Sequence, residues 1–539
     1  MKRLIRIGSR KSDLARLQAK LVGQALTERG YGVEYVFREA PADVNLSNPL
    51  WQMPTVGVFT SFLHEYLLKG EVDVVVHSWK DLPIDKNPGT SVVATLTRED
   101  PRDLFLFKKD QHDSHSELIV LTSSPRRKHN LADFLGRIIP FHSKLSPDRN
   151  APRNVRFLDV RGNIQTRMAK LCDPERLQLD PDTNRSADGL IVAKAAVDRF
   201  LSTVDPEFAS TRDAVRKTLE QCHWAVLPLS VNPTAAAQGA LALEVSDAKP
   251  EIKEIIEGLN CEKTFSACEE ERRILKSLGG GCHQKIGCTV LPRHFGNVYS
   301  LRGESDKGQD INWFGIGRVQ EHDDRKGGQM IPDTHRAVGG RHGLSVFERE
   351  EISLDRLALS KNTSRNILIT KSDALPKDAL PALFPGSTIW TAGIDSWLKL
   401  VQRNIWVNGC SDRLGEGEDP MIDALVGGDR MTWLKLTHED APGTDKIATY
   451  RLKPIQGAVE KLRDHLSSST VDSRVTHIFW ASSSCFEFAF RSVPELLLDP
   501  GIIHGCGPGH TFDAVSKKID MDRIVVCLGV EEFVRKTSA

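Results

Sequence analysis

The chain has 539 residues, of which 40% are hydrophobic and 27% are charged. This length exceeds what a single hydrophobic core organises, and the composition is that of a globular protein, so we expect several domains. Lysine plus arginine and aspartate plus glutamate balance at 72 each, which argues against a protein that binds nucleic acid through its net charge.

The N-terminal segment, MKRLIRIGSRKSDLA, is basic but lacks the apolar core of a secretory signal. No apolar run is long enough to span a membrane. We expect a cytoplasmic monomer with no membrane or nucleic-acid partner, and ten cysteines that stay reduced. An alternative for four of the cysteines is a zinc site, although no C-x-x-C pair occurs: Cys261, Cys268, Cys282 and Cys288.

Strand-like and helix-like segments alternate over the first 245 residues, which predicts an α/β fold with largely parallel sheets. The expected strands are LIRIG (4–8), VDVVVHS (72–78), ELIVLTSS (117–124), VRFLDV (155–160) and GLIVAKAAV (189–197). A charged helix is expected at 266–278. The segment 320–345, rich in glycine and charge, predicts an inserted loop or linker, and a second α/β region begins near residue 365.

Three junctions between a predicted strand and a predicted helix carry hydroxyl groups and cations: VHSWKDLP, TSSPRR and VRGNIQTR. Strand ends in such sheets face the ligand crevice, and helix N-termini there present free N–H groups. Arginine adds planar donors that suit carboxylates and phosphates. Each arginine alone is more often a surface group, but together the junctions predict a polyanion site. Its candidate residues are Arg10, Ser78, Lys80, Thr122, Ser123, Ser124, Arg126, Arg127, Arg161, Arg167 and Arg199.

Asp81 and Cys282 differ in kind from the residues around them. Asp81 lies among cations; it could stabilise a cationic intermediate or move a proton, or be a helix cap or an ion-pair partner. Cys282 follows the glycine run of GGGCHQKIG (279–287), where the backbone can approach another group closely. It is either an ordinary loop cysteine or a covalent attachment point whose pKa His283 and Lys285 lower.

The order of these motifs resembles the porphobilinogen deaminase (hydroxymethylbilane synthase) family over about residues 1–320. The shared segments are IGSRKSDLA, VDVVVHSWKDLP, REDPRDLFLF, TSSPRRKHNL, VRGNIQTRMAKL, AAAQGALALEV and the GGGC loop. The resemblance implies two lobes like those of periplasmic binding proteins, the first at 1–97 plus 200–245 and the second at 98–199. A small α/β domain at 246–320 would hold the cofactor cysteine, and an insertion or linker would follow at 321–359.

The resemblance also implies a reaction. Porphobilinogen units would join stepwise, with loss of ammonia, on a dipyrromethane cofactor bound to Cys282 through a thioether, and hydrolysis would release hydroxymethylbilane. Asp81 would steady the positive pyrrole nitrogen and assist proton movement; no metal is implied. Cofactor contacts would come from Ser78, Lys80, Thr122, Ser123, Ser124, Arg126 and Arg127, and contacts to substrate carboxylates from Arg10, Ser12, Arg161, Arg167, Arg199 and Gln238.

The segment WQMPTVGVFTSF (51–62) departs from the family pattern, because Gln52 and Val56 stand where lysines are common. AAAQGA and Pro125 also differ from the usual residues of the family. These departures put the turnover rate and the loop dynamics in doubt more than the membership.

Residues 360–539 resemble a second family, uroporphyrinogen-III synthase, at TYRLKP (449–454), HIFWASSSCFEFAF (477–490) and HGCGPGHTFDAV (504–515). That family has two α/β lobes joined by a β-ladder and closes hydroxymethylbilane to uroporphyrinogen III, inverting ring D, without a cofactor. Tyr450 would help the hydroxyl group to leave. Carboxylate contacts would come from Ser482, Ser484 and Thr511, each of which could instead be a strand or cap residue.

The whole chain is thus interpreted as a bifunctional enzyme of haem biosynthesis, a transferase fused to a lyase. One alternative keeps the deaminase and makes the C-terminal region a degenerate structural or regulatory module. Another is a two-lobed anion-binding protein without catalysis, which a bilobed fold permits but for which Asp81 and the Cys282 loop have no use.

Overall fold

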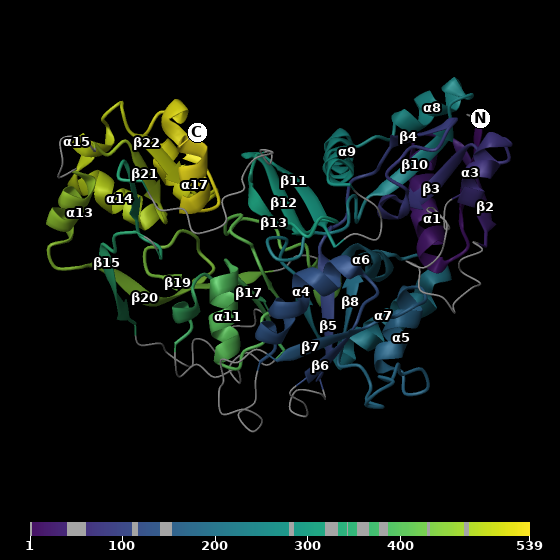
Figure 1. Ribbon diagram of the computed structural model, residues 1–539, viewed down its shortest axis with the longest axis horizontal. Helices are drawn as coiled ribbons and strands as arrows, with labels where there is room; N and C mark the ends of the chain where they lie inside the picture. Colours follow the sequence, from purple (N-terminus) through teal and green to yellow (C-terminus); the bar gives the residue numbers. More distant parts are fainter. Residues whose placement is uncertain are drawn as a thin grey trace.

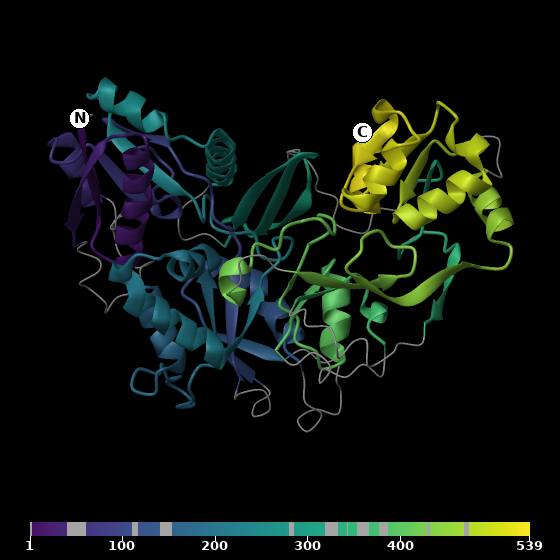
Figure 2. The same cartoon turned by 180° about the vertical axis from the view of Figure 1, so that it is seen from behind.

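The computed structural model describes residues 3–39, 61–109, 117–140, 153–279, 285–317, 332–341, 343–352, 366–376, 386–427, 432–467 and 474–538. Over these ranges the chain forms a mixed α/β fold with five β-sheets (Figures 1 and 2). None of the helices in these ranges is both long enough and apolar enough to cross a membrane.

The first lobe is built on a five-stranded sheet in the order β2-β1-β3-β10-β4. Its strands are β1 (Leu4–Arg10), β2 (Gly32–Arg38), β3 (Val74–Ser78), β4 (Thr90–Ala94) and β10 (Leu241–Ser246). β1 runs parallel to β2 and β3, whereas β10 is antiparallel to β3 and β4. The helices α1 (Asp13–Glu28), α3 (Ser61–Leu68) and α8 (Pro250–Glu257) pack against this sheet.

The second lobe repeats this pattern with the order β7-β6-β8-β5-β9. Its strands are β5 (Asp103–Lys108), β6 (Glu117–Leu121), β7 (Asn154–Leu158), β8 (Gly189–Ala193) and β9 (Cys222–Val226). β6 is parallel to both of its neighbours, and β5 is antiparallel to β8 and β9. The helices are α4 (Pro125–Ile138), α5 (Ile164–Cys172), α6 (Lys194–Ser202) and α7 (Ala209–Gln221), with a 3₁₀ turn η4 (Pro206–Phe208) before α7.

The border between the lobes differs from the one expected, which gave residues 200–245 to the first lobe. β9 pairs with β5 of the second sheet, and α7 packs on α5 and α6. The chain returns to the first lobe only after Val226, where β10 joins β3. A strand's hydrophobic pattern shows that it is buried but not which sheet it joins.

A third, smaller sheet is an antiparallel meander of β11 (Gly287–Arg293), β12 (Gly296–Glu304) and β13 (Asp310–Ile316). The helix α9 (Glu262–Ser277) packs on β11. Both views place this sheet between the first lobe and the C-terminal end of the chain (Figures 1 and 2). We call α9 and this sheet the third domain.

Residues 332–538, which we call the C-terminal module, contain two sheets. One is wholly parallel and consists of β14 (His335–Val338), β21 (His477–Trp480), β22 (Ile503–Cys506) and β23 (Ile524–Val526). The other has the order β15-β20-β19-β16-β17-β18. Its strands are β15 (Phe347–Glu351), β16 (Asn366–Ile369), β17 (Thr388–Thr391), β18 (Gly409–Cys410), β19 (Trp433–His438) and β20 (Lys446–Pro454).

Two strands of this module come from the segment expected to be a linker. β14 forms the edge of the parallel sheet, and β15 pairs antiparallel with β20. Both strands are short and lie among glycine and charged residues, so their hydrophobic periodicity is weak. The described part of 321–359 therefore belongs to the module.

The helices of the module are α11 (Ile394–Gln402), α12 (Asp423–Val426), α13 (Ala458–Leu466), α14 (Ser483–Ser492), α15 (Pro494–Leu497), α16 (His510–Ser516) and α17 (Val530–Thr537), with 3₁₀ turns η5 (Ser372–Ala374) and η7 (Met521–Arg523). α11 lies against α4 of the second lobe (Figure 1).

The second lobe and the C-terminal module share one continuous apolar core. The rings of Phe134 on α4 and Trp397 on α11 meet edge to face, with centroids 5.9 Å apart. Phe107 of β5 stacks on Trp406 at 6.0 Å. Because these contacts are buried and apolar, we infer that the two halves fold as one body and are not joined only by a flexible tether.

We therefore expect both halves to unfold in a single calorimetric transition. Phe134, which is 6% exposed, loses its contact with Trp397 in Phe134→Ala, and such a change costs about 3–5 kcal/mol. The midpoint should fall for both halves together. Val459→Ala, at a position that is 37% exposed in the module, should leave it in place; two separate transitions in the native protein would contradict the shared core.

Candidate active site between the two lobes

A cleft with a volume of about 820 Å³ lies between α1 of the first lobe and α5 and β8 of the second. Its cations outnumber its carboxylates. The cations are Arg10, Lys11, Lys80, Arg127, Arg161, Arg167 and Lys170, and the carboxylates are Asp13, Glu39 and Asp81. Asp13 is already engaged by neighbouring donors, among them Arg16 and Thr211, so the cleft as a whole favours an anionic ligand.

The turn that follows β3 carries Asp81, a carboxylate that lines the cleft. This 3₁₀ turn, η2, spans Trp79–Asp81 and leaves Asp81 exposed to the cleft. The Lys80 ammonium donates to Gln238 Oε1 at 3.1 Å. Burial lowers the pKa of Lys80 to about 8, an effect that the neighbouring Asp81 partly offsets. Ser78 at the end of β3 exchanges hydrogen bonds with Gln18 of α1 at 3.0–3.1 Å.

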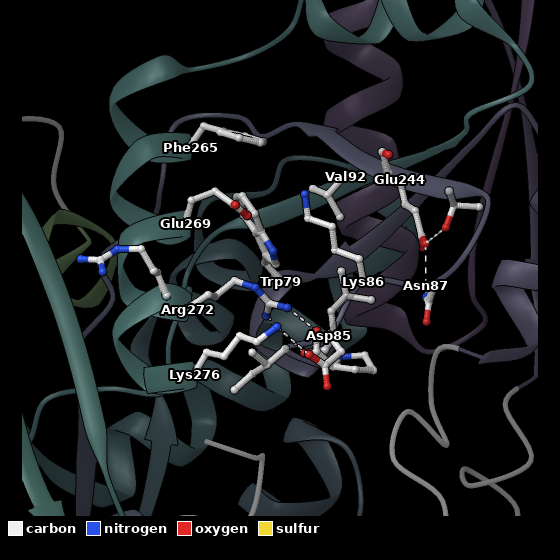
Figure 3. A pocket seen from close by; sticks show the side chains of 16 residues that line it. Trp79, Asp85, Lys86, Asn87, Val92, Glu244, Phe265, Glu269, Arg272 and Lys276 are labelled. Atoms are coloured by element: carbon white, nitrogen blue, oxygen red, sulfur yellow. Dashed lines mark hydrogen bonds and ion pairs between the residues drawn. The ribbon is translucent and has the colours of Figure 1, made fainter. Parts of the chain in front are cut away.

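The rear of this turn faces a second cavity, of about 530 Å³, where α9 braces it (Figure 3). The Arg272 guanidinium donates to the carbonyl oxygens of Leu82, at 3.3 Å, and Pro83. The Trp79 ring packs against Phe265 of α9, with centroids 5.2 Å apart. The third domain therefore fixes the position of the turn that lines the cleft.

Asp103, at the start of β5, organises the two arginines that begin α4. Its carboxylate accepts from Arg126 at 3.0 Å and from Arg127 at 2.7 and 2.9 Å. It also accepts from Asn232 at 2.9 Å and from Gln238 at 2.7 Å. These donors hold the pKa of the fully buried Asp103 carboxyl far below its usual range, against the opposing effect of burial. Arg127 also lines the cleft, whereas Arg126 does not.

The arginines of the second lobe's cleft wall repel one another. Burial lowers the pKa of Arg167 to about 10, and the charges of Arg127 and Arg161 lower it further, while Asp81 opposes them. Arg167 Nε donates to the Gly162 carbonyl at 2.8 Å. A ligand with several carboxylates would relieve this repulsion, so the residues present fit a polyanionic group.

The structure brings together eight of the residues expected from the sequence as lining of the cleft: Arg10, Ser12, Ser78, Lys80, Asp81, Arg127, Arg161 and Arg167. Ser12 occupies the N-cap position of α1 without a side-chain capping bond. Cys282 and His283 lie outside the described residues.

Other expected residues form hydrogen bonds with backbone groups of the two lobes and do not line the cleft. Ser123 Oγ donates to the Val160 carbonyl at 2.7 Å, and Ser124 caps α4 by accepting from the Arg127 amide. Arg199 donates to the Gly239 carbonyl at 2.7 Å. The expected residues of the first half that are described but do not line the cleft are Thr122, Ser123, Ser124, Arg126, Arg199 and Gln238.

Sequence reasoning missed Lys11, Gln18, Asp103 and Lys170. Lys11 and Lys170 had a signal, because each lies in a motif that was already singled out and Lys170 is one helical turn after Arg167. Asp103 stands in REDPRDLFLF, but only the fold brings it to the start of α4.

In the C-terminal module, Tyr450 lies on β20 and is buried. The guanidinium carbon of Arg349 lies 3.4 Å from the centre of its ring. Burial raises the pKa of the Tyr450 phenol, and Arg349 opposes the rise. His438 of β19 lies beside Tyr450, with ring centroids 5.9 Å apart.

The two lobes of the module, each built on one of its two sheets, approach each other at Gly415. A Cβ atom there would lie 3.2 Å from the Pro508 carbonyl oxygen.

The other candidates of the module lie at helix starts. Ser482 caps α14, because its Oγ accepts from the Cys485 amide at 3.3 Å. Ser484 and Thr511 lie in the first turns of α14 and α16 and are half-buried.

The described residues contain no group of three or more histidine, cysteine or acidic side chains placed to hold a metal ion. Of the four cysteines considered for zinc, Cys268 and Cys288 are buried in apolar clusters, and burial raises the pKa of both thiols.

The fold and the cleft define a two-lobed α/β protein with a cation-rich cleft between its lobes. Residues 5–254 match the family model "Porphobilinogen deaminase, dipyromethane cofactor binding domain". The chain is 30% identical to a probable porphobilinogen deaminase of Picrophilus torridus over 56% of this chain and 91% of that protein. It is 32% identical to the porphobilinogen deaminase of Desulfitobacterium hafniense over 56% of this chain and 86% of that protein.

This chain belongs to the porphobilinogen deaminase family, which acts in tetrapyrrole synthesis and carries a dipyrromethane cofactor. Among solved structures, it aligns with the methionine binding protein MetQ at 11% identity over 49% of this chain and 92% of that chain, with a TM-score of 0.26. Scores of this size do not establish a common fold.

Replacing Asp103 tests the role of the buried carboxylate. Asp103→Asn leaves Arg126 and Arg127 without their acidic partner, and breaking a buried pair in this way costs about 3–5 kcal/mol. We expect a correspondingly lower free energy of unfolding in urea. Asp133→Asn, at an exposed position on α4, the helix that carries Arg126 and Arg127, is the control, and equal stability of the two variants would refute the assigned role.

The pKa of Lys80 predicts a pH dependence. Because its pKa of about 8 lies below the usual value, Lys80 loses its charge as the pH rises through about 8, and the cleft then attracts carboxylates less. We expect kcat/KM for porphobilinogen to fall above that pH, and Lys80→Arg to move the fall to higher pH. The exposed Lys86→Arg should not move it. An unchanged profile in Lys80→Arg would assign the fall to another group.

Proposed function

We propose that the chain is a bifunctional enzyme of tetrapyrrole synthesis. The first half would join four porphobilinogen molecules into hydroxymethylbilane, and the C-terminal module would close that product to uroporphyrinogen III with ring D inverted. The observation that carries the first activity is a cleft rich in cations that also presents the exposed carboxylate of Asp81, whereas the other exposed carboxylate of its lining, Glu39, is paired with Lys11.

The cations of the cleft would bind the acetate and propionate arms of the pyrroles. Arg127 and Arg167 would do so from the second lobe, and Arg10 from the first. Guanidinium groups suit this task because they bind carboxylates in a bidentate geometry and stay charged. A substrate held by both lobes would be oriented relative to Asp81, which lowers the entropy cost of the reaction.

Asp81 would act on positive charge and on protons. Loss of ammonia from porphobilinogen and attack by a pyrrole α-carbon both place positive charge on a pyrrole nitrogen, and a nearby carboxylate stabilises that charge. The same carboxylate can accept the proton released when the new ring becomes aromatic again. The bond between Lys80 and Gln238, together with the contacts of Arg272, would keep the turn in position.

The dipyrromethane cofactor, when bound, supplies the pyrrole to which the first substrate is added. Cys282 would hold it by a thioether, and it lies five residues before Gly287 at the start of β11. A Cβ atom at Gly287 would lie 3.0 Å from the side chain of Arg126, so this strand begins beside α4 of the second lobe. Five residues span at most about 17 Å, and Cys282 itself lies outside the described residues.

The second activity is supported by the topology and by Tyr450. The chain starts the parallel sheet with β14, crosses on β15 to build the other sheet, and returns on β20, the antiparallel partner of β15. Tyr450 lies on that return strand. Because burial raises its pKa, the phenol keeps its proton near neutral pH and can donate it to a leaving hydroxyl group.

The fusion has a physical rationale. Hydroxymethylbilane closes by itself to the wrong isomer, and a synthase on the same chain would meet it at a raised effective concentration. The alternative is that the module has only a structural role, which its shared core with the second lobe favours.

The isomers of uroporphyrin separate these proposals. After incubation with porphobilinogen and oxidation, we expect isomer III to dominate for the native protein. Tyr450→Phe should give mostly isomer I at an unchanged total yield, and Asp81→Asn should lower the total rate by about 10²–10⁴. Tyr299→Phe, a buried tyrosine on β12, is the matched control. Isomer I as the main native product would refute the synthase and leave the deaminase standing.

A further inference from the structure

A cavity of about 310 Å³ lies where three parts of the chain meet, and we call it the junction cavity. Its walls come from the segment 97–102 that connects the two lobes, from the third domain at the start of α9 and the end of β11, and from 410–421 of the C-terminal module. It shares no lining residue with the cleft.

The charged groups on the lobe side of the junction cavity are already compensated. Arg98 donates to both carboxylate oxygens of Glu271, at 2.6 and 3.0 Å. Arg102 binds Asp100 in the same manner, with one contact of 2.8 Å. All four side chains are nearly or fully buried, so a charged ligand would have to break a buried ion pair to bind them.

The module side is compensated as well. Arg293 forms an ion pair with Glu418, and the buried Asp412 accepts from the Ser230 amide at 2.9 Å. The remaining charged side chains of the lining are the half-buried Glu99 and the exposed Lys263 and Asp419. Unlike the cleft, the junction cavity has no excess of cations.

The rest of the lining is mainly apolar and includes Leu229, Val290, Leu291, Pro292, Trp390 and Leu414. Paired charges and apolar walls together select against ions and for apolar surface. The volume is at the lower end of small-molecule sites, which suits a compact ring system.

We propose that the junction cavity binds a small, uncharged, apolar molecule of one or two fused rings. Such a ligand would contact the connection between the lobes, the third domain and the C-terminal module at once. It would stabilise one arrangement of these three parts, because a ligand favours the conformation to which it binds best. The proposal does not depend on which reaction the C-terminal module performs.

Two probes of the same shape test the ligand class. Neutral 2-aminonaphthalene should bind the full-length protein saturably, with one site per chain, whereas anionic 2-naphthoate should not compete with it. Leu414→Trp fills the cavity and should abolish the binding. Leu498→Trp, at a position that is 49% exposed in the same module, should not. Equal competition by 2-naphthoate, or no saturable binding of the amine, would overturn the proposal.

Cys261 gives a second readout that needs no variant. It lines the junction cavity and is half-buried, and a hydrogen bond to Thr264 lowers the pKa of its thiol. At a concentration of 2-aminonaphthalene about ten times its Kd, alkylation of Cys261 by N-ethylmaleimide should slow about tenfold, because only the free fraction reacts. Cys172, half-buried on α5, should react at an unchanged rate in the same sample. If Cys261 is not protected, the ligand does not occupy this cavity.

Discussion

The Asp103 carboxylate is the contact on which the rest of the structure depends. It sits at the start of β5, where the chain has just crossed from the first lobe, and it binds both arginines that begin α4. Through Asn232 and Gln238 it also holds the segment by which the chain returns. Gln238 in turn accepts from Lys80 beside Asp81. One buried charge therefore connects the second lobe, both crossings and the turn of the cleft, at a desolvation cost that only its complete set of donors offsets.

The second lobe and the C-terminal module are likewise held together by buried contacts. The second lobe offers one face of its sheet and α4, and the module covers them with α11 and Trp406. Lys194, which is fully buried, donates to the carbonyl of Met421 in the module as well as to Asp198. Removing the module would expose this apolar face and leave part of that hydrogen bonding unmade. The fusion thus serves the stability of the second lobe whatever reaction the module performs.

The arginines of the cleft and those of the junction cavity have different electrostatic surroundings. In the cleft, Arg127, Arg161 and Arg167 lie close enough to lower the pKa of Arg167, and this repulsion is the property that a polycarboxylate would relieve. In the junction cavity, Arg98 and Arg102 have buried acidic partners. Both regions are rich in arginine, and Arg127 of the cleft also has a buried acidic partner, Asp103. The two regions differ because cations outnumber carboxylates in the lining of the cleft but not in that of the junction cavity.

The sequence by itself determined the family, the α/β class and most strands of the first half, because strand patterns and strand-to-helix motifs are local. It also placed Arg10, Asp81 and Arg167 in one site, since strand ends of such sheets face one crevice. Only the tertiary structure decided that β9 belongs to the second lobe, that β14 and β15 belong to the C-terminal module, and that Arg126 faces Asp103. The physical reason is that strand pairing and ion pairing are made between residues far apart in the sequence, and local periodicity carries no information about such partners.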